Sequence, residues 1–199
     1  MKGRSSFFAA FVLFAVACTS AAVAEPDELL LQASEVDVAY SAEVREDAPF
    51  IMGDCLVDNL GQRIEGAQTA AINFEGRAAG DGFTHFVATT GGRAPGDVLD
   101  EIENLLRDCE PDMSASVSSD SIMTTTTTRE LADGPAVGDK SLWTSFTLDI
   151  GHTSGYSSDG DASPSVVFVK SGALHRLTAP VTLPWNEAVD FILEHADKL

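Results

Sequence analysis

The sequence contains few cysteines and none of the common catalytic signatures. Its three cysteines stand at positions 18, 55 and 109, so no Cys-x-x-Cys pair exists, which argues against a redox-active dithiol. Gly-x-Ser-x-Gly, His-Glu-x-x-His, P-loop and Gly-x-Gly-x-x-Gly motifs are also missing. From the sequence we therefore expect no catalytic site, no metal and no cofactor.

Basic residues are scarce as well, with 12 Lys and Arg against 31 Asp and Glu. Two of the basic residues, Lys2 and Arg4, lie before residue 25, whereas every acidic residue lies after residue 24. The chain from residue 25 onward therefore carries 10 basic and 31 acidic residues, a net charge of −21. Such acidity argues against nucleic-acid binding and against charge-driven adhesion to anionic membranes.

No apolar run is long enough to cross a bilayer, but a shorter one opens the chain. Residues 7–17 are apolar and follow Lys2 and Arg4, a pattern typical of a signal peptide over residues 1–24. Two processing sites compete within it. A lipobox ending at Cys18 would give a lipoprotein, whereas cleavage after Ala24 would give a secreted protein. Either route predicts an extracytoplasmic protein with a short tether, whose only contact with the membrane would be a lipid anchor.

The clearest helix signal lies between residues 97 and 109. Its apolar residues recur at helical spacing: Val98, Ile102, Leu105, Leu106 and Cys109. A Pro-Gly pair precedes the run and a proline follows it, as expected at helix ends. The pattern predicts an amphipathic helix with Cys109 on its buried face, directly after a strand at residues 83–90.

Two cysteines stay in the mature chain whether Cys18 is lipidated or removed. An even number in an exported protein predicts a disulfide, here between Cys55 and Cys109. Closing that loop would stabilise the fold by roughly 4 kcal/mol. We expect residues 43–66 to be an irregular loop that the bond pins to the helix. A pair of buried free thiols is the alternative.

The rest of the chain reads mainly as strands. Predicted strands cover residues 67–75, 121–130, 141–150, 165–170 and 173–179, with two short helical pieces at 28–42 and a helix at 184–199. The five consecutive threonines suggest an edge strand, or else a glycosylated linker. Short links between strands favour antiparallel pairing. The predicted fold is one α+β domain over residues 28–199, with an antiparallel sheet of about six strands, two long helices on one face and one disulfide.

Polar residues that could carry chemistry are scattered. The four histidines, which are far apart in sequence and are interpreted as structural, are His85, His152, His175 and His195. The densest polar cluster is Asp149, His152, Asp159 and Asp161. Carboxylates at this spacing suit a hard cation such as Ca²⁺, but the remaining ligands of an EF-hand loop are missing. A solvated acidic loop is the simpler interpretation.

An ordered series of features between Glu28 and Leu199 carries a family resemblance. The series comprises a Leu-rich start, the Cys55 segment, the strand at 83–87 leading through a Pro-Gly turn into a helix ending Arg107-Asp108-Cys109, the Gly138-Asp139-Lys140-Ser141 run, the hairpin at 165–177 and a closing helix. It resembles the PknH-like extracytoplasmic sensor domains, which occur on bacterial receptor kinases and as exported lipoproteins. The resemblance implies a twisted antiparallel sheet with a cleft, and binding without catalysis. Kinase-linked members carry two disulfides, whereas this chain can form only one.

These features predict an exported, lipid-anchored, non-catalytic sensor domain for an unknown small molecule or envelope protein. That function predicts an apolar cleft between sheet and helices, without converging titratable groups. An envelope interaction module is the first alternative, and it requires a long unpaired edge at residues 122–128. A hydrolase is the second, and it requires a serine and a carboxylate beside His152 or His175.

Overall fold

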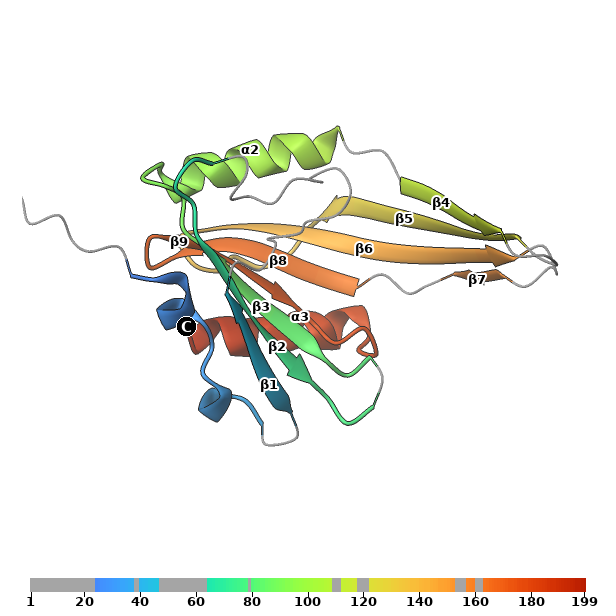
Figure 1. Ribbon diagram of the computed structural model, residues 1–199, viewed down its shortest axis with the longest axis horizontal. Helices are drawn as coiled ribbons and strands as arrows, with labels where there is room; N and C mark the ends of the chain where they lie inside the picture. Colours follow the sequence, from blue (N-terminus) through green and yellow to red (C-terminus); the bar gives the residue numbers. More distant parts are fainter. Residues whose placement is uncertain are drawn as a thin grey trace, which may run out of the picture.

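A single antiparallel sheet organises the computed structural model, which describes residues 24–37, 40–46, 64–78, 80–108, 112–117, 122–152, 157–159 and 163–199 (Figure 1). Its nine described strands are β1 (Ser41–Glu46), β2 (Thr69–Glu75), β3 (Phe83–Ala88), β4 (Asp112–Val117), β5 (Ile122–Ala132), β6 (Lys140–His152), β7 (Ser157–Asp159), β8 (Ser163–Lys170) and β9 (Ala173–Thr178). Helices α2 (Pro95–Arg107) and α3 (Trp185–Asp197) and the 3-10 turns η1 (Pro26–Leu29) and η2 (Ala33–Glu35) complete it. The predicted α+β class with an antiparallel sheet is confirmed.

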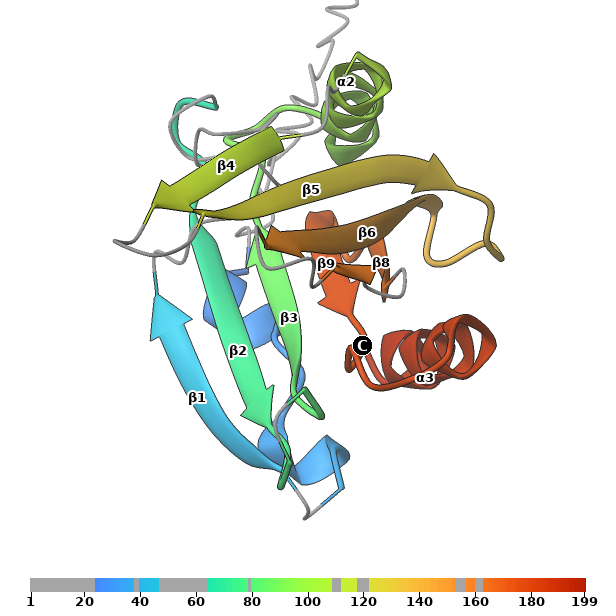
Figure 2. The same cartoon turned by 90° about the vertical axis from the view of Figure 1, so that its right-hand side faces the viewer.

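The strand order is β1-β2-β3-β9-β8-β6-β5-β4, with β7 paired beside β6. The chain therefore builds two runs of neighbouring strands, β1 to β3 and β4 to β9, and joins them where β9 pairs with β3. Helix α2 makes the crossover between β3 and the far edge strand β4 (Figures 1 and 2). As a result, the last strand in sequence lies in the middle of the sheet.

The two helices cover opposite faces of the sheet. Val167 and Val169 of β8 pack in the cluster that contains the apolar face of α2, whereas Val166 and Phe168 pack in the cluster that contains α3. Figure 1 shows α2 and α3 on the two sides of the strands. The prediction that both helices share one face was wrong, because β8 is apolar on consecutive positions and both of its faces need cover. We call the two sides the α2 face and the α3 face.

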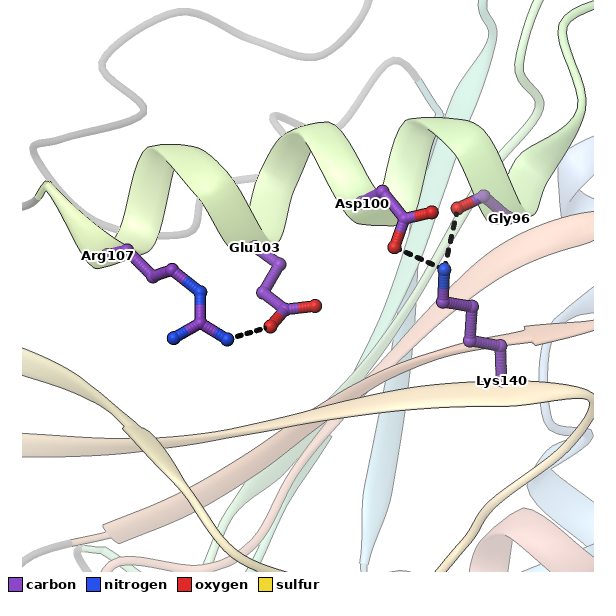
Figure 3. A network of polar contacts seen from close by, with 5 residues as sticks. All are labelled: Gly96, Asp100, Glu103, Arg107 and Lys140. Carbon is purple, nitrogen blue, oxygen red and sulfur yellow. Dashed lines mark hydrogen bonds and ion pairs between the residues drawn. The ribbon is translucent and has the colours of Figure 1, made fainter.

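Helix α2 confirms the amphipathic pattern. Its buried side chains are Val98, Leu99, Ile102 and Leu106, while Leu105 is half-buried. Figure 3 shows Lys140 of β6 reaching the first turns of the helix, where its ammonium donates to the Gly96 carbonyl oxygen at 3.3 Å and pairs with Asp100. Arg107 and Glu103 form a second ion pair along the helix (Figure 3). Both pairs are exposed, so the buried stripe supplies most of the attachment.

The α3 face holds the larger core, and aromatic rings fill its centre. Phe83 stacks on Phe74 with ring centroids 4.5 Å apart and meets the edges of Tyr40 and Phe191 at 5.3 and 4.8 Å. Buried aliphatic residues from both ends of the chain join this cluster: Leu30, Leu31, Val36, Ala188, Ile192 and Ala196. The N-terminal segment and α3 therefore share one core.

Several sequence predictions about local structure need correction. The helical pieces expected at 28–42 are two short 3-10 turns followed by strand β1, and strands β4 and β7 were not predicted. The threonine-rich strand β5 is not an edge, because β4 and β6 pair with it on its two sides. Among the described strands the edges are β1, β4 and the short β7, which pairs with β6 alone. All six residues of β1 are exposed, and charged side chains such as Glu43 and Arg45 discourage pairing with another sheet.

Some predicted features lie outside the described residues. They are the signal peptide with Cys18, the two cysteines Cys55 and Cys109, and Asp161. Within the described part of the chain, neither helix has the length and apolar character needed to span a bilayer.

Helix truncations test whether the two faces are separate cores. We expect Ile102→Ala in α2 and Ile192→Ala in α3 each to lower the free energy of unfolding by about 2–5 kcal/mol, because each side chain is buried in its own cluster. The losses should add to within about 0.5 kcal/mol in the double variant. Urea denaturation measures all three, with Val181→Ala, 59% exposed, as a control expected to change stability by less than about 0.5 kcal/mol. A strongly non-additive double variant would contradict the two-core description.

Candidate functional site

A pocket whose wall combines apolar and polar side chains opens on the α2 face, beside the area that the helix covers. Its volume is about 300 Å³, and it is lined by Gly82, Phe83, Thr84, Phe146, Ser163, Pro164, Ser165, Arg176, Thr178, Ala179 and Val181. Strands β3, β6, β8 and β9 contribute most of these residues. The pocket is at the small end of the range for ligand sites.

Strand register brings the pocket's polar side chains to one face. Arg176 of β9 lies directly opposite Phe86 of β3, and Ser165 of β8 lies opposite Thr178 of β9. These residues share a face with Val167 and Leu174, which pack with α2. The helix therefore covers one apolar part of this face, and the pocket forms over the adjoining part that contains Arg176.

Arg176 supplies the pocket's charge. It is the one charged residue among those that line the pocket, and it is only 8% exposed. Its guanidinium carbon lies 5.4 Å from the centre of the Phe86 ring, a cation–π contact that holds the planar group over the aromatic face. A buried, stacked guanidinium presents fixed donors that match a carboxylate or phosphate.

Hydrogen bonds fix the hydroxyl groups around Arg176. The backbone N–H of Thr84 donates to Thr178 Oγ1 at 3.0 Å, and Thr84 Oγ1 donates to Asn73 Oδ1 at 2.9 Å. On the other side, Ser165 Oγ and Thr144 Oγ1 lie 3.2 Å apart. The pocket wall is therefore positioned before any ligand arrives, which lowers the entropic cost of binding.

A second polar feature lies on the α3 face, where His85 of β3 and His175 of β9 stack with ring centroids 5.3 Å apart. The backbone N–H of Leu31 donates to His85 Nδ1 at 3.0 Å. His85 Nε2 lies 3.1 Å from His175 Nδ1, and His175 Nε2 lies 3.1 Å from the carbonyl oxygen of Lys170. Because a backbone N–H can only donate, both rings must be neutral and protonated on Nε2 for every bond to form.

Burial is the main cause of the lowered pKa of both histidines in this pair. It lowers the pKa of His175 to about 4, partly offset by the bond to the Lys170 carbonyl, which raises the pKa. Burial also places the pKa of His85 well below its usual value, and the neighbouring His175 lowers the pKa further. Both imidazoles are consequently neutral at pH 7.

A second pocket, of about 360 Å³, lies beside the turn before α2. It is lined by Gly66, Gln68, Thr89, Thr90, Gly91, Gly92, Arg93 and Gly172. The charge of Arg93 is already paired with Glu101 at 2.8 Å. Glycine backbone dominates the remaining wall, so this pocket offers fewer fixed recognition groups than the Arg176 pocket.

Of the histidines singled out from the sequence, His85 and His175 come together on the α3 face and His195 lies in α3, whereas the side chains of His152 and Asp159 lie outside the described part of the structure. The partners of His175 are His85 and a backbone carbonyl, not a serine and a carboxylate. Register pairs residue 149 of β6 with residue 159 of β7, but no group of three His, Cys, Asp or Glu within the described ranges could hold a metal ion. His195 bonds through Nδ1 to the Phe191 carbonyl oxygen at 2.8 Å and belongs to the core.

Sequence reasoning missed Arg176 altogether. The available signal was a charged residue inside the apolar run of β9, Ala173-Leu174-His175-Arg176-Leu177. The sequence predicts an apolar cleft between sheet and helices; the Arg176 pocket lies beside α2 instead, and its wall combines apolar side chains with one buried charge. The sequence also predicts that no titratable groups converge, but two groups with a lowered pKa do so, His85 and His175.

No protein-family model, curated protein or solved structure matches the chain.

The His175 pKa gives a pH-dependent stability with a definite sign. Between pH 6.5 and about 4 the unfolded chain takes up a proton at this position that the folded chain does not, so the stability contributed by His175 is lost as the pH falls. We expect the stability of wild type relative to His175→Gln to fall by roughly 2 kcal/mol between pH 7 and pH 5. Urea denaturation of both proteins measures it, and because the comparison is differential, the titration of the many carboxylates cancels. A difference that does not change with pH would contradict the lowered pKa.

Proposed function

We propose that this chain is an exported, lipid-anchored, non-catalytic binding domain of the sensor type, and that its ligand is a small molecule with a carboxylate bound by Arg176. The observation that carries the proposal is the buried, stacked guanidinium in a hydroxyl-lined pocket. The resemblance to PknH-like sensor domains supports a binding role outside the cytoplasmic membrane.

The pocket's chemistry supports an anionic ligand with an apolar part. Arg176 and the hydroxyls of Ser163 and Ser165 offer donors to a carboxylate. Phe146 and Val181 line the same pocket and would contact a ring or short aliphatic group. A volume of about 300 Å³ suits a small organic acid better than a peptide.

The described residues also weigh against the two alternative functions. An envelope interaction module that binds through residues 122–128 needs an unpaired edge there, but β5 is paired on both sides. A hydrolase based on His175 needs a nucleophile and a carboxylate beside it, whereas that ring is bonded to another histidine and a carbonyl oxygen.

Two covalent features belong to the same proposal. A lipid on Cys18 would hold the domain at the outer face of the membrane, and a disulfide between Cys55 and Cys109 would tie the segment before β2 to the end of α2. All three cysteines lie outside the described residues, and the support for both features is the sequence alone.

Benzoate is a suitable probe of the pocket because it combines a carboxylate with a ring. We expect it to shift the amide NMR signals of residues on β3, β8 and β9 that line the pocket, since the carboxylate would bind the Arg176 guanidinium. Arg176→Gln should weaken benzoate binding at least tenfold. The affinity of Arg176→Lys should lie between those of wild type and Arg176→Gln, because lysine keeps the charge but not the planar pair of donors.

Arg107→Gln is the matched control, because it removes the same charge from an exposed position on α2. Its affinity for benzoate should stay within twofold of wild type. Equal losses in Arg107→Gln and Arg176→Gln, or shifts that map outside the pocket, would contradict the assignment. The amide spectrum of Arg176→Gln without benzoate shows directly whether that variant is folded.

The intact mass of the protein from its native host tests the covalent features. We expect a chain that starts at Cys18 with a diacylglyceryl group, and alkylation of Cys55 and Cys109 only after reduction. A chain starting at Glu25 would show that the domain is secreted without an anchor. Two thiols that react with the alkylating agent before reduction would remove the disulfide from the proposal.

A further inference from the structure

The N-terminal segment, residues 24–37, lies on the α3 face, and Leu31 near its middle contacts the buried His85. Pro26, Leu30, Leu31 and Val36 are buried, while the remaining residues are exposed or half-buried. Only short 3-10 turns support its backbone. The segment therefore depends on its contacts with the sheet and α3 for its position, and few internal hydrogen bonds hold it together.

One hydrogen bond joins this segment to the His85–His175 pair. The N–H of Leu31 donates to His85 Nδ1 at 3.0 Å, and both residues are almost completely buried, with 1% and 0% exposed. A proton on Nδ1 would place two N–H groups face to face at that distance. His85 cannot avoid this by a change of tautomer, because its Nε2 already needs a proton to donate to His175.

The charged groups around the pair offer no compensation for a proton on His85. The nearest is Lys170, whose carbonyl oxygen accepts from His175 and whose ammonium donates to the Ala196 carbonyl oxygen at 2.9 Å. His195 of α3, the other titratable ring on this face, is bonded to Phe191 and its pKa is lowered by burial. The carboxylates on the described elements around the pair are all exposed: Glu25, Asp27, Glu28, Glu35, Asp37, Glu75, Glu187, Asp190, Glu194 and Asp197. A cation at His85 would have no buried counter-charge among the described residues.

We propose that residues 24–37 form a proton-released latch, which is docked at neutral pH through the Leu31–His85 hydrogen bond and detaches when His85 takes up a proton, while the sheet and both helices stay folded. Detachment moves Leu31 away from the His85 ring and exposes that ring to water. The inference does not depend on the ligand of the Arg176 pocket, which lies on the opposite face.

Linkage fixes the direction of the response. In the detached form His85 is hydrated and titrates near its ordinary value of about 6.5, whereas in the docked form it stays neutral well below that pH. The detached form therefore binds one more proton, and its population should rise about tenfold per pH unit below pH 6.5. From pH 7 to pH 5 the expected increase is roughly 20-fold.

Native-state hydrogen exchange of the full chain tests the latch. We expect the protection factor of the Leu31 amide, which is corrected for the intrinsic exchange rate, to fall roughly 20-fold between pH 7 and pH 5. The amides of Val167 and Phe168 in β8 are the internal control and should remain far more protected than Leu31 at both pH values, because they open only with the whole domain. A Leu31 protection factor that is constant with pH, or that equals the β8 value throughout, would overturn the proposal.

The variant His85→Asn sharpens the test because the asparagine Oδ1 can accept from the Leu31 N–H but does not titrate. In this variant the Leu31 protection factor should change less than threefold between pH 7 and pH 5. A 20-fold fall that persists in the variant would show that another group carries the response. If His85→Asn does not fold, the comparison of Leu31 with β8 in the wild-type protein still supports or overturns the latch.

Discussion

Burial of β8 and β9 on both faces is the constraint on which the rest of the structure depends. Six of the eight residues of β8 form an unbroken buried stretch from Pro164 to Val169. Alternate side chains point to opposite sides, so one helix cannot cover them all. Helix α2 covers one side, and α3 with the N-terminal segment covers the other. The position of β9 between β3 and β8 follows, because a strand buried on both faces is best placed inside the sheet.

The same alternation separates the two polar sites. His175 and Arg176 are neighbours in sequence but point to opposite faces of β9. Each is buried, and each is accommodated differently: the histidine by hydrogen bonds that require the neutral ring, the arginine by an aromatic face and a polar pocket. A fixed cation that lines an open pocket can recognise an anionic ligand, whereas a neutral ring within a closed hydrogen-bond chain offers no charge.

Much of the secondary structure was predictable from the sequence, because periodicity is a local property. The stripe from Val98 to Leu106 defined α2, and alternation defined β3, β6, β8 and β9. The arrangement in space was less predictable from the sequence. An apolar run such as Val166-Val167-Phe168 requires cover on both faces of its strand, whereas the sequence analysis predicts helices on one face of the sheet only. The threonine run looked like an edge because its neighbour β4, Asp112–Val117, has no clear pattern. Both sites escaped prediction because they unite residues about 90 positions apart, as in His85 with His175.

The acidity of the chain connects both sites to the solvent. With 31 acidic and 12 basic residues, the net charge is negative, so an anionic ligand needs a local cation such as Arg176 to offset the repulsion. The same negative potential attracts protons and favours the protonated form of a histidine once that ring is exposed. Salt screens this effect over about 8 Å at physiological ionic strength. Release of the N-terminal segment should therefore begin at a higher pH in dilute buffer than in concentrated salt, whereas the docked, desolvated ring is too deeply buried for salt to change its state.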